Sequence, residues 1–210
     1  MATKGKRSLE KPQRIEQIER AAQSVFFKKG FFNSTVEEIA ENAQISKGTI
    51  YLYFKGKDEL YVSLMIPMIE ELGRLLDRFA HDLTSEKYRT KRDVFMGFYE
   101  VYMKLHNYDP DGIKIFQIFQ LENLYPVMSK EVRERLKALG KRNFEVARSI
   151  IAESIKLGLL PEVEPVKLAD VLWSLFLGVM QVEKSKLALS KKDHMPGTLE
   201  FAFSLISDGL

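Results

Sequence analysis

The chain has 210 residues, 45% of them hydrophobic and 29% charged, which suits a globular protein with a sizeable core. It has no cysteine, so a disulfide framework and a thiolate metal site are excluded. Residues 1–17 lack the apolar centre of a signal peptide, and no uninterrupted apolar run reaches the roughly 18 residues of a membrane span. We therefore expect a soluble, cytoplasmic protein with no membrane partner.

The excess positive charge of the chain lies near its N-terminus. The net charge is +3, and the first 60 residues hold 11 Lys and Arg against 8 Asp and Glu, so the remainder is balanced. Basic residues crowd the extreme N-terminus: Lys4, Lys6, Arg7, Lys11 and Arg14. Such an end fits either a polyanionic partner or a solvated tail, and both interpretations stay open.

Hydrophobic residues recur at helical spacing from the beginning of the chain. A first helix is predicted over about residues 12–29, with Gly30 as its stop signal. A short second helix follows, capped by Ser34 or Thr35, with Glu38 placed to complete a capping box.

The stretch ISKGTIYLYFKGKDEL, residues 45–60, predicts a third short helix. Ser46 can cap it, and Ile50 and Phe54 lie four residues apart and face inward. Glycine and tyrosine are not strong helix formers, so their presence on the remaining face requires another reason.

That remaining face carries Lys47, Gly48, Thr49 and Tyr51. Two short helices joined by a tight turn are typical of a unit that places its second helix in the major groove of DNA. There a lysine can donate to guanine, a threonine methyl can contact a thymine methyl, and a glycine lets the backbone approach closely. The alternative is a helical hairpin whose tyrosines pack on a neighbouring element.

From about Arg14 to Leu60 the sequence resembles the TetR family of bacterial transcriptional regulators. The string AAQSVFFKKGFFNSTVEEIAENAQISKGTIYLYFKGKDEL carries the residues of that family in register. The resemblance implies an all-α protein with a three-helix DNA-binding domain over residues 1–60 and a larger helical domain over 61–210 that dimerises and binds an effector. It assigns Lys47, Gly48, Thr49 and Tyr51 to the groove of the DNA, and Thr35, Tyr53 and Lys57 mainly to the DNA backbone. Ser46 completes the predicted set of DNA-binding residues.

One residue departs from the family pattern. The turn before the third helix usually holds glycine, whereas this chain has Gln44. If the position is left-handed, glutamine adopts that conformation at a cost of order 1 kcal/mol.

The rest of the chain predicts further helices, for a total of about nine. A fourth is expected from Lys57 to Leu83 with a bend at Pro67, because proline removes the hydrogen bond to the carbonyl of Ser63. The others are expected over residues 90–107, 112–123, 129–157, 165–190 and 196–208.

No catalytic, metal or cofactor motif accompanies these helices. His81, His106 and His194 are isolated and lack metal-ligand spacing. Phosphate-binding loops, dinucleotide glycine runs and nucleophile elbows do not occur. We expect no enzyme activity, although a site assembled from scattered residues stays an alternative.

Aromatic residues are abundant beyond residue 90. The resemblance favours a pocket for an unknown small apolar or aromatic effector, whereas plain core is the alternative for each residue. The predicted lining is Phe95, Phe98, Tyr99, Tyr102, Met103, Phe116, Phe119, Trp173 and Phe176.

Two apolar stripes near the C-terminus predict a homodimer formed by four helices, two from each chain, around a two-fold axis. The stripes contain Leu168, Val171, Leu172, Leu175, Val179, Leu199, Phe203 and Ile206.

Together these patterns predict a sequence-specific transcriptional regulator of double-stranded DNA. We expect a repressor that the effector releases from a palindromic operator. The alternatives are a helical enzyme and an architectural protein that binds DNA without sequence preference.

Overall fold

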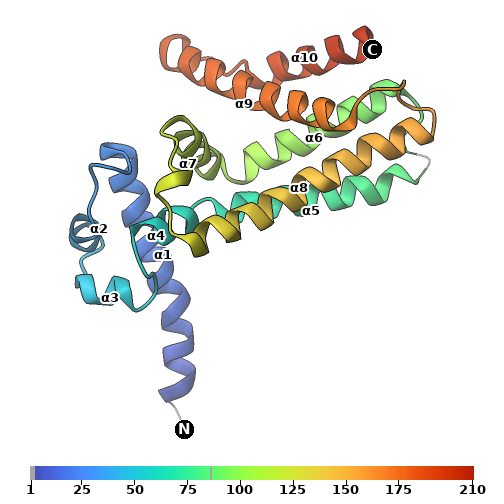
Figure 1. The fold of residues 1–210 in the computed structure, drawn as a ribbon. Helices are drawn as coiled ribbons and strands as arrows, with labels where there is room; N and C mark the ends of the chain where they lie inside the picture. Colours follow the sequence, from blue (N-terminus) through green and yellow to red (C-terminus); the bar gives the residue numbers. More distant parts are fainter. Residues whose placement is uncertain (1–2, 86) are drawn as a thin grey trace. The chain divides into compact units, whose positions relative to one another are not determined.

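The computed structural model describes the backbone of residues 3–85 and 87–210, and the side chains of these residues except 3–10, 188 and 190. The described chain is helical and contains no strand, which confirms the predicted all-α class (Figure 1). Most of the basic residues near the N-terminus, Lys4, Lys6 and Arg7, have side chains outside the described residues.

The chain forms two compact units. The first contains the residues up to Pro67 together with Ile118–Leu136, and the second contains Met68–Gln117 and Lys137–Leu210. The first unit is therefore built from two separate stretches of sequence, whereas a continuous DNA-binding domain over residues 1–60 was expected.

The first unit begins with four helices: α1 (Thr3–Lys29), α2 (Val36–Asn42), α3 (Lys47–Tyr51) and α4 (Lys57–Ser63). Its core contains Phe26 and Tyr61, whose ring centroids lie 4.8 Å apart in an edge contact. The rings of Phe31 and Tyr61 make a second edge contact at 5.3 Å. These aromatic contacts attach α4 to the end of α1, which supports the short α2 and α3 between them.

The prediction of a single bent helix from Lys57 to Leu83 is wrong, because the chain forms α4 and a separate α5 (Ile66–Leu83). Pro67 stands in the first turn of α5, where its missing N–H costs nothing. The two intervening residues make the tighter bonds of a 3₁₀ turn, from the Leu64 N–H to the Tyr61 carbonyl and from the Met65 N–H to the Val62 carbonyl.

The remaining helices are α6 (Lys91–Tyr108), α7 (Pro110–Leu121), α8 (Lys130–Lys156), α9 (Pro165–Ser190) and α10 (Met195–Gly209), with a 3₁₀ turn η1 (Tyr125–Val127) before α8. These bounds confirm the five predicted helices to within about two residues. The α7 helix and the α8 helix each begin in one unit and end in the other.

The second unit has its core where α6, α9 and α10 meet (Figure 1). Phe98, Leu172, Phe176 and Phe203 are fully buried there. By length and composition alone, Pro165–Leu187 of α9 could cross a membrane. The absence of a membrane partner therefore stays a prediction.

Candidate nucleic-acid interface

The second helix begins at a complete capping box. The Glu38 N–H donates to the Thr35 hydroxyl over 3.2 Å, and the Thr35 N–H donates to the Glu38 carboxylate over 3.0 Å. Both bonds use N–H groups that a helix start otherwise leaves unpaired. The predicted cap is confirmed, and Thr35 keeps an exposed side chain.

The turn between α2 and α3 has the geometry that glycine usually supplies. Gln44 has φ of 54°, so this position is left-handed. The Ile45 N–H bonds to the Ala40 carbonyl and the Gln44 N–H to the Glu41 carbonyl, the two bonds of a Schellman motif. The side chain of Gln17 also donates to the Ala43 carbonyl over 2.6 Å, which attaches α1 to this turn. The turn therefore forms without glycine.

The third helix is capped by Ser46, whose hydroxyl accepts from the Thr49 N–H over 3.1 Å. Ile50 is buried, as the spacing predicted, and so is Phe54. In contrast, Lys47 and Gly48 are exposed, and Tyr51 is 47% exposed. The residues predicted to enter the groove thus share the outward side of α3, although the Thr49 side chain is only half-exposed.

Gly48 has no packing partner that requires a glycine. A Cβ built on this residue would meet only the Ser46 hydroxyl, at an ordinary contact distance of 3.7 Å. In a helix interior glycine costs roughly 1 kcal/mol relative to alanine, and Gly48 lies in the first turn of α3. The described packing of the chain therefore provides no reason for Gly48.

The ammonium of Lys47 lies between two groups of the first unit. It forms an ion pair with the Glu37 carboxylate, and it lies 5.7 Å from the centroid of the Tyr51 ring. The hydrogen bond from Lys47 lowers the pKa of Glu37, and the same bond raises the pKa of Lys47. Both groups are therefore charged at neutral pH.

Lys57, to which the resemblance assigns a contact with the DNA backbone, is bonded within its own unit. Its ammonium donates to the carbonyls of Phe31 and Ser34, at 2.6 and 2.8 Å, and lies 4.3 Å from the centroid of the Phe31 ring. Burial lowers the pKa of this lysine. The side chain thus binds the turn between α1 and α2 of its own unit. Tyr53, which the resemblance also assigns to the DNA backbone, is half-buried.

Sequence reasoning also missed two surface residues beside α3. Leu52 is 80% exposed next to Tyr51, and Glu37 pairs with Lys47 from the first turn of α2. Hydrophobic spacing offered no signal for either residue, because both lie outside the buried stripes.

In the second unit, part of the predicted effector lining forms one aromatic cluster. The Tyr102 ring stacks on Phe176 at 4.9 Å and meets Trp173 edge-on at 5.7 Å, while Phe116 lies 6.0 Å from Trp173. Burial raises the pKa of Tyr102. These rings pack directly on one another, so a bound molecule would have to separate them.

The other predicted lining residues lie at the edge of this cluster or elsewhere. The ring centroid of Tyr99 lies 6.4 Å from that of Phe203, which in turn contacts Tyr102. Met103 is half-buried on α6. Phe98 packs on Phe79 at 5.0 Å, and Phe95 is buried. Phe119 is misplaced in the predicted lining, because it belongs to the first unit, where its ring lies 6.4 Å from that of Tyr61.

The predicted dimer stripes are partly used inside the chain. Leu168, Leu172, Leu199 and Phe203 are buried within the second unit, so their side chains are not available to a partner. Val171 is exposed, and Leu175, Val179 and Ile206 are half-buried. Further exposed apolar side chains that the prediction missed are Val182, Leu189, Phe201 and Leu205.

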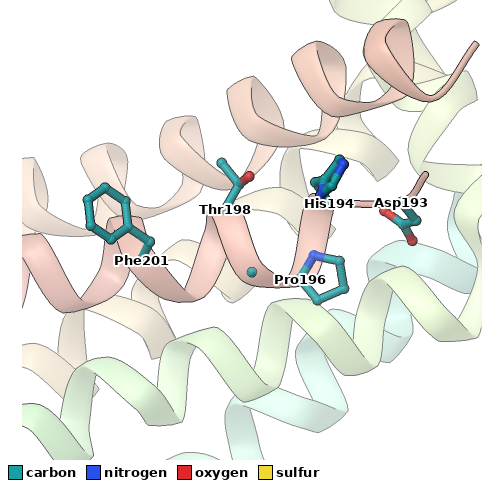
Figure 2. A pocket seen from close by; sticks show the side chains of 6 residues that line it. Asp193, His194, Pro196, Thr198 and Phe201 are labelled. Carbon is teal, nitrogen blue, oxygen red and sulfur yellow. The ribbon is translucent and has the colours of Figure 1, made fainter. Parts of the chain in front are cut away.

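An open hollow lies at the start of α10, next to this apolar surface (Figure 2). Phe201 and Thr198 line it on α10, and Asp193 and His194 line it before the helix begins. The Thr198 hydroxyl donates to the buried carboxylate of Glu183 over 2.8 Å. This bond attaches the first turn of α10 to α9.

Comparisons with known proteins agree with this architecture. The family model described as "Bacterial regulatory proteins, tetR family" matches residues 18–64, which include α2 and α3. The "Fatty acid metabolism regulator protein" of Bacillus subtilis (strain 168) is 30% identical over 156 residues, covering 73% of this chain and 74% of that protein.

Two further proteins are similar over most of the chain. The "HTH-type transcriptional regulator RutR" of Escherichia coli (strain K12) is 27% identical over 177 residues, covering 82% of this chain and 76% of that protein. The crystal structure of the transcriptional regulator FadR from Bacillus subtilis in complex with stearoyl-CoA is 21% identical, with a TM-score of 0.66 over 93% of this chain and 98% of that one. With this capped helix-turn-helix and these relatives, the chain belongs to the TetR family of bacterial regulatory proteins and is a DNA-binding transcriptional regulator.

Proposed function

We propose that the protein is a cytoplasmic homodimeric repressor that an apolar effector releases from a palindromic operator. The observation that carries this proposal is the outward face of α3, where Lys47, Gly48 and Tyr51 are exposed on a helix held by its cap and by Ile50. A helix with this face can enter the major groove and present donors to base edges.

Within that proposal the residues have separate roles. Lys47 can donate to guanine, the Thr49 methyl can contact a thymine methyl, and Tyr51 can reach a base or a phosphate. The Ser46 and Thr35 side chains carry hydroxyl groups, which can donate hydrogen bonds to phosphate oxygens. Phosphate contacts fix the register of the protein, and base contacts supply the sequence preference.

A palindromic operator requires two copies of α3 at a fixed separation. The exposed apolar side chains of α9 and α10 support a dimer formed through these helices, because burying apolar side chains in an interface is favourable. A dimer interface also explains why α9 is apolar, without a membrane. The mass of the protein in solution without detergent distinguishes a dimer from a membrane protein, since a protein with a membrane-spanning helix would aggregate under that condition.

The effector that we propose is a long-chain fatty acyl-CoA or a related acyl molecule. One support is the relative named for fatty acid metabolism, and another is the fold shared with a regulator solved in complex with stearoyl-CoA. The chemistry of the second unit also fits, since Tyr102, Trp173 and Phe176 form an apolar cluster between helices.

Trp173 allows effector binding to be measured directly. It is the only tryptophan of the chain, and it contacts Tyr102, Phe116 and Phe176. Stearoyl-CoA that separates these rings should change the tryptophan fluorescence, and free coenzyme A serves as the control. A Trp173 signal that stearoyl-CoA leaves unchanged at saturating concentration would contradict this effector class.

A mobility shift tests the DNA-binding part of the proposal. The full-length protein is titrated against the duplex upstream of its own gene and against a scrambled duplex of the same composition. We expect tighter binding to the first, with release when stearoyl-CoA is added. Equal affinity for both duplexes would favour an architectural DNA-binding protein instead.

A further inference from the structure

Glu37 places a negative charge beside the proposed reading face, where it is unfavourable for DNA binding. Its carboxylate is exposed in the first turn of α2 and pairs with Lys47, the first residue of α3. Removing an acidic group near DNA normally raises the affinity for any sequence, because phosphates repel it. The dipole of α2 favours an acid in its first turn, and the position beside Lys47 adds a second advantage that offsets the lost affinity.

The advantage follows from the geometry around the Lys47 ammonium. Glu37 holds the ammonium from α2, and the Tyr51 ring lies 5.7 Å from it, one helical turn further along α3. A lysine side chain is long and flexible, so an unrestrained ammonium reaches a range of phosphates as easily as one base. Two contacts from different helices restrict that range.

The ion pair leaves Lys47 able to bind a base. An ammonium has three N–H donors, and the single contact with Glu37 uses one of them. The other two can donate to the O6 and N7 acceptors of one guanine. Glu37 and a guanine can thus bind the Lys47 ammonium at the same time. If the ammonium instead bound a distant phosphate, it would have to leave Glu37.

We propose that Glu37 is a positioning residue that directs Lys47 to a base edge and so increases sequence selectivity at the expense of affinity. This inference rests on the proposed function, in which Lys47 reads a base. Glu41 provides the matched comparison, because it is an exposed acid one turn further along α2 and makes no ion pair within the described residues.

The test compares Glu37→Gln with Glu41→Gln on the upstream and the scrambled duplexes. Both variants lose one negative charge and should bind the scrambled duplex more tightly. Only Glu37→Gln should lower the ratio of the two affinities, by roughly two- to fivefold per subunit, which is the range of an exposed ion pair. In the Lys47→Ala background, Glu37→Gln should leave the ratio unchanged.

The outcomes separate the inference from the proposed function. If the wild-type protein shows no preference between the duplexes, the proposed function fails. If Lys47→Ala removes the preference but Glu37→Gln and Glu41→Gln behave alike, only the positioning role of Glu37 is overturned. A Glu37→Gln variant that loses affinity equally for both duplexes would show that the ion pair merely stabilises α2 and α3, which also overturns it.

Discussion

At the scale of single residues, Gly48 separates a requirement of folding from a requirement of binding. Alanine at this position would meet no obstacle inside the chain, because a Cβ would touch only the Ser46 hydroxyl at 3.7 Å. Glycine therefore weakens α3 without improving its packing. This conflict between local stability and sequence is typical of functional sites.

We expect Gly48→Ala to raise the free energy of unfolding by about 0.5–1 kcal/mol and to weaken operator binding. The gain comes from lost backbone freedom in the unfolded chain, and the loss comes from a methyl group between α3 and the groove. Gly140→Ala is the control, because Gly140 lies within α8 and a Cβ there has open space. The control should gain similar stability and keep its DNA affinity. If Gly48→Ala binds the operator as tightly as wild type, the hypothesis that α3 closely approaches the DNA at Gly48 is wrong.

Lys57 matches a family motif, and its ammonium is bonded within its own unit. We expect Lys57→Met to lower the free energy of unfolding by roughly 1.5 kcal/mol, because it removes two bonds from a charged donor to the Phe31 and Ser34 carbonyls. Denaturant titration measures this, with Lys28→Met as an exposed control. The salt dependence of DNA binding should not change. A slope that falls by about one per subunit, at unaltered stability, would place Lys57 on a phosphate after all.

Local chemistry explains which residues could be predicted from sequence. The Thr35 and Ser46 caps require only neighbours three residues away, so their spacing was sufficient. The Lys57 bonds require carbonyls 23 and 26 residues earlier, at the turn after α1. No periodic pattern reports such a contact.

At the scale of elements, the break between α4 and α5 also depends on packing that sequence periodicity does not report. Pro67 correctly indicated an irregularity, since proline excludes the bond to Ser63 in either arrangement. A bend and a complete interruption satisfy that exclusion equally. The choice depends on packing, and the fully buried Met65 in the interruption shows that packing decides here.

The start of α8 is attached to α4 within the first unit. The Ser129 N–H donates to the Asp58 carboxylate over 2.9 Å, and Lys55 forms an ion pair with Glu131 at 2.6 Å. The ion pair is exposed and contributes little. Burial acts to raise the pKa of Asp58, but the hydrogen bonds from Ser129 and from backbone N–H groups outweigh it and hold the pKa below its usual value.

We expect Asp58→Ala to lower the free energy of unfolding by about 0.5–1 kcal/mol at pH 7, as for the loss of a helix cap. Because the folded pKa is depressed, this contribution is fully present above the ordinary carboxyl pKa and is lost as the pH falls through the lower folded value. The difference from wild type should therefore shrink below about pH 4. Denaturant titrations at pH 7, 5 and 3 measure it, with Glu134→Ala on the exposed side of α8 as control. A difference that is constant with pH would exclude the carboxylate bond as its cause.

At the scale of the whole molecule, the helices of the two units differ in length and in the side chains that they expose. The short capped helix α3 of the first unit exposes Lys47 and Tyr51, whereas the longer α9 and α10 of the second unit expose apolar side chains such as Val182 and Phe201. Sequence periodicity predicted the long helices well. It did not show which apolar residues of α9 face the core and which face outward. Leu172 and Val171 are adjacent in sequence, and only the assembled unit shows that one is buried and the other exposed.

The exposed apolar stripe of α9 should determine the oligomeric state. Val171, Leu175, Gly178 and Val182 recur at intervals of three and four residues, which places them on one side of the helix. Val182 is 57% exposed, and a Cβ added at Gly178 would have open space, so a second helix could approach closely there. Phe201, 64% exposed on α10, extends the same kind of surface.

We expect Val182→Glu to convert the dimer into a folded monomer. The new carboxylate would remain in water in the free chain and cost the fold little, whereas an apolar interface would bury it. A monomer occupies one half-site at a time, so affinity for a full palindrome should fall by orders of magnitude while circular dichroism stays unchanged. Leu157→Glu, which alters a half-exposed leucine after α8, is the matched control and should remain dimeric. Sedimentation equilibrium decides the matter, because a Val182→Glu dimer of wild-type stability would exclude this face of α9 from the interface.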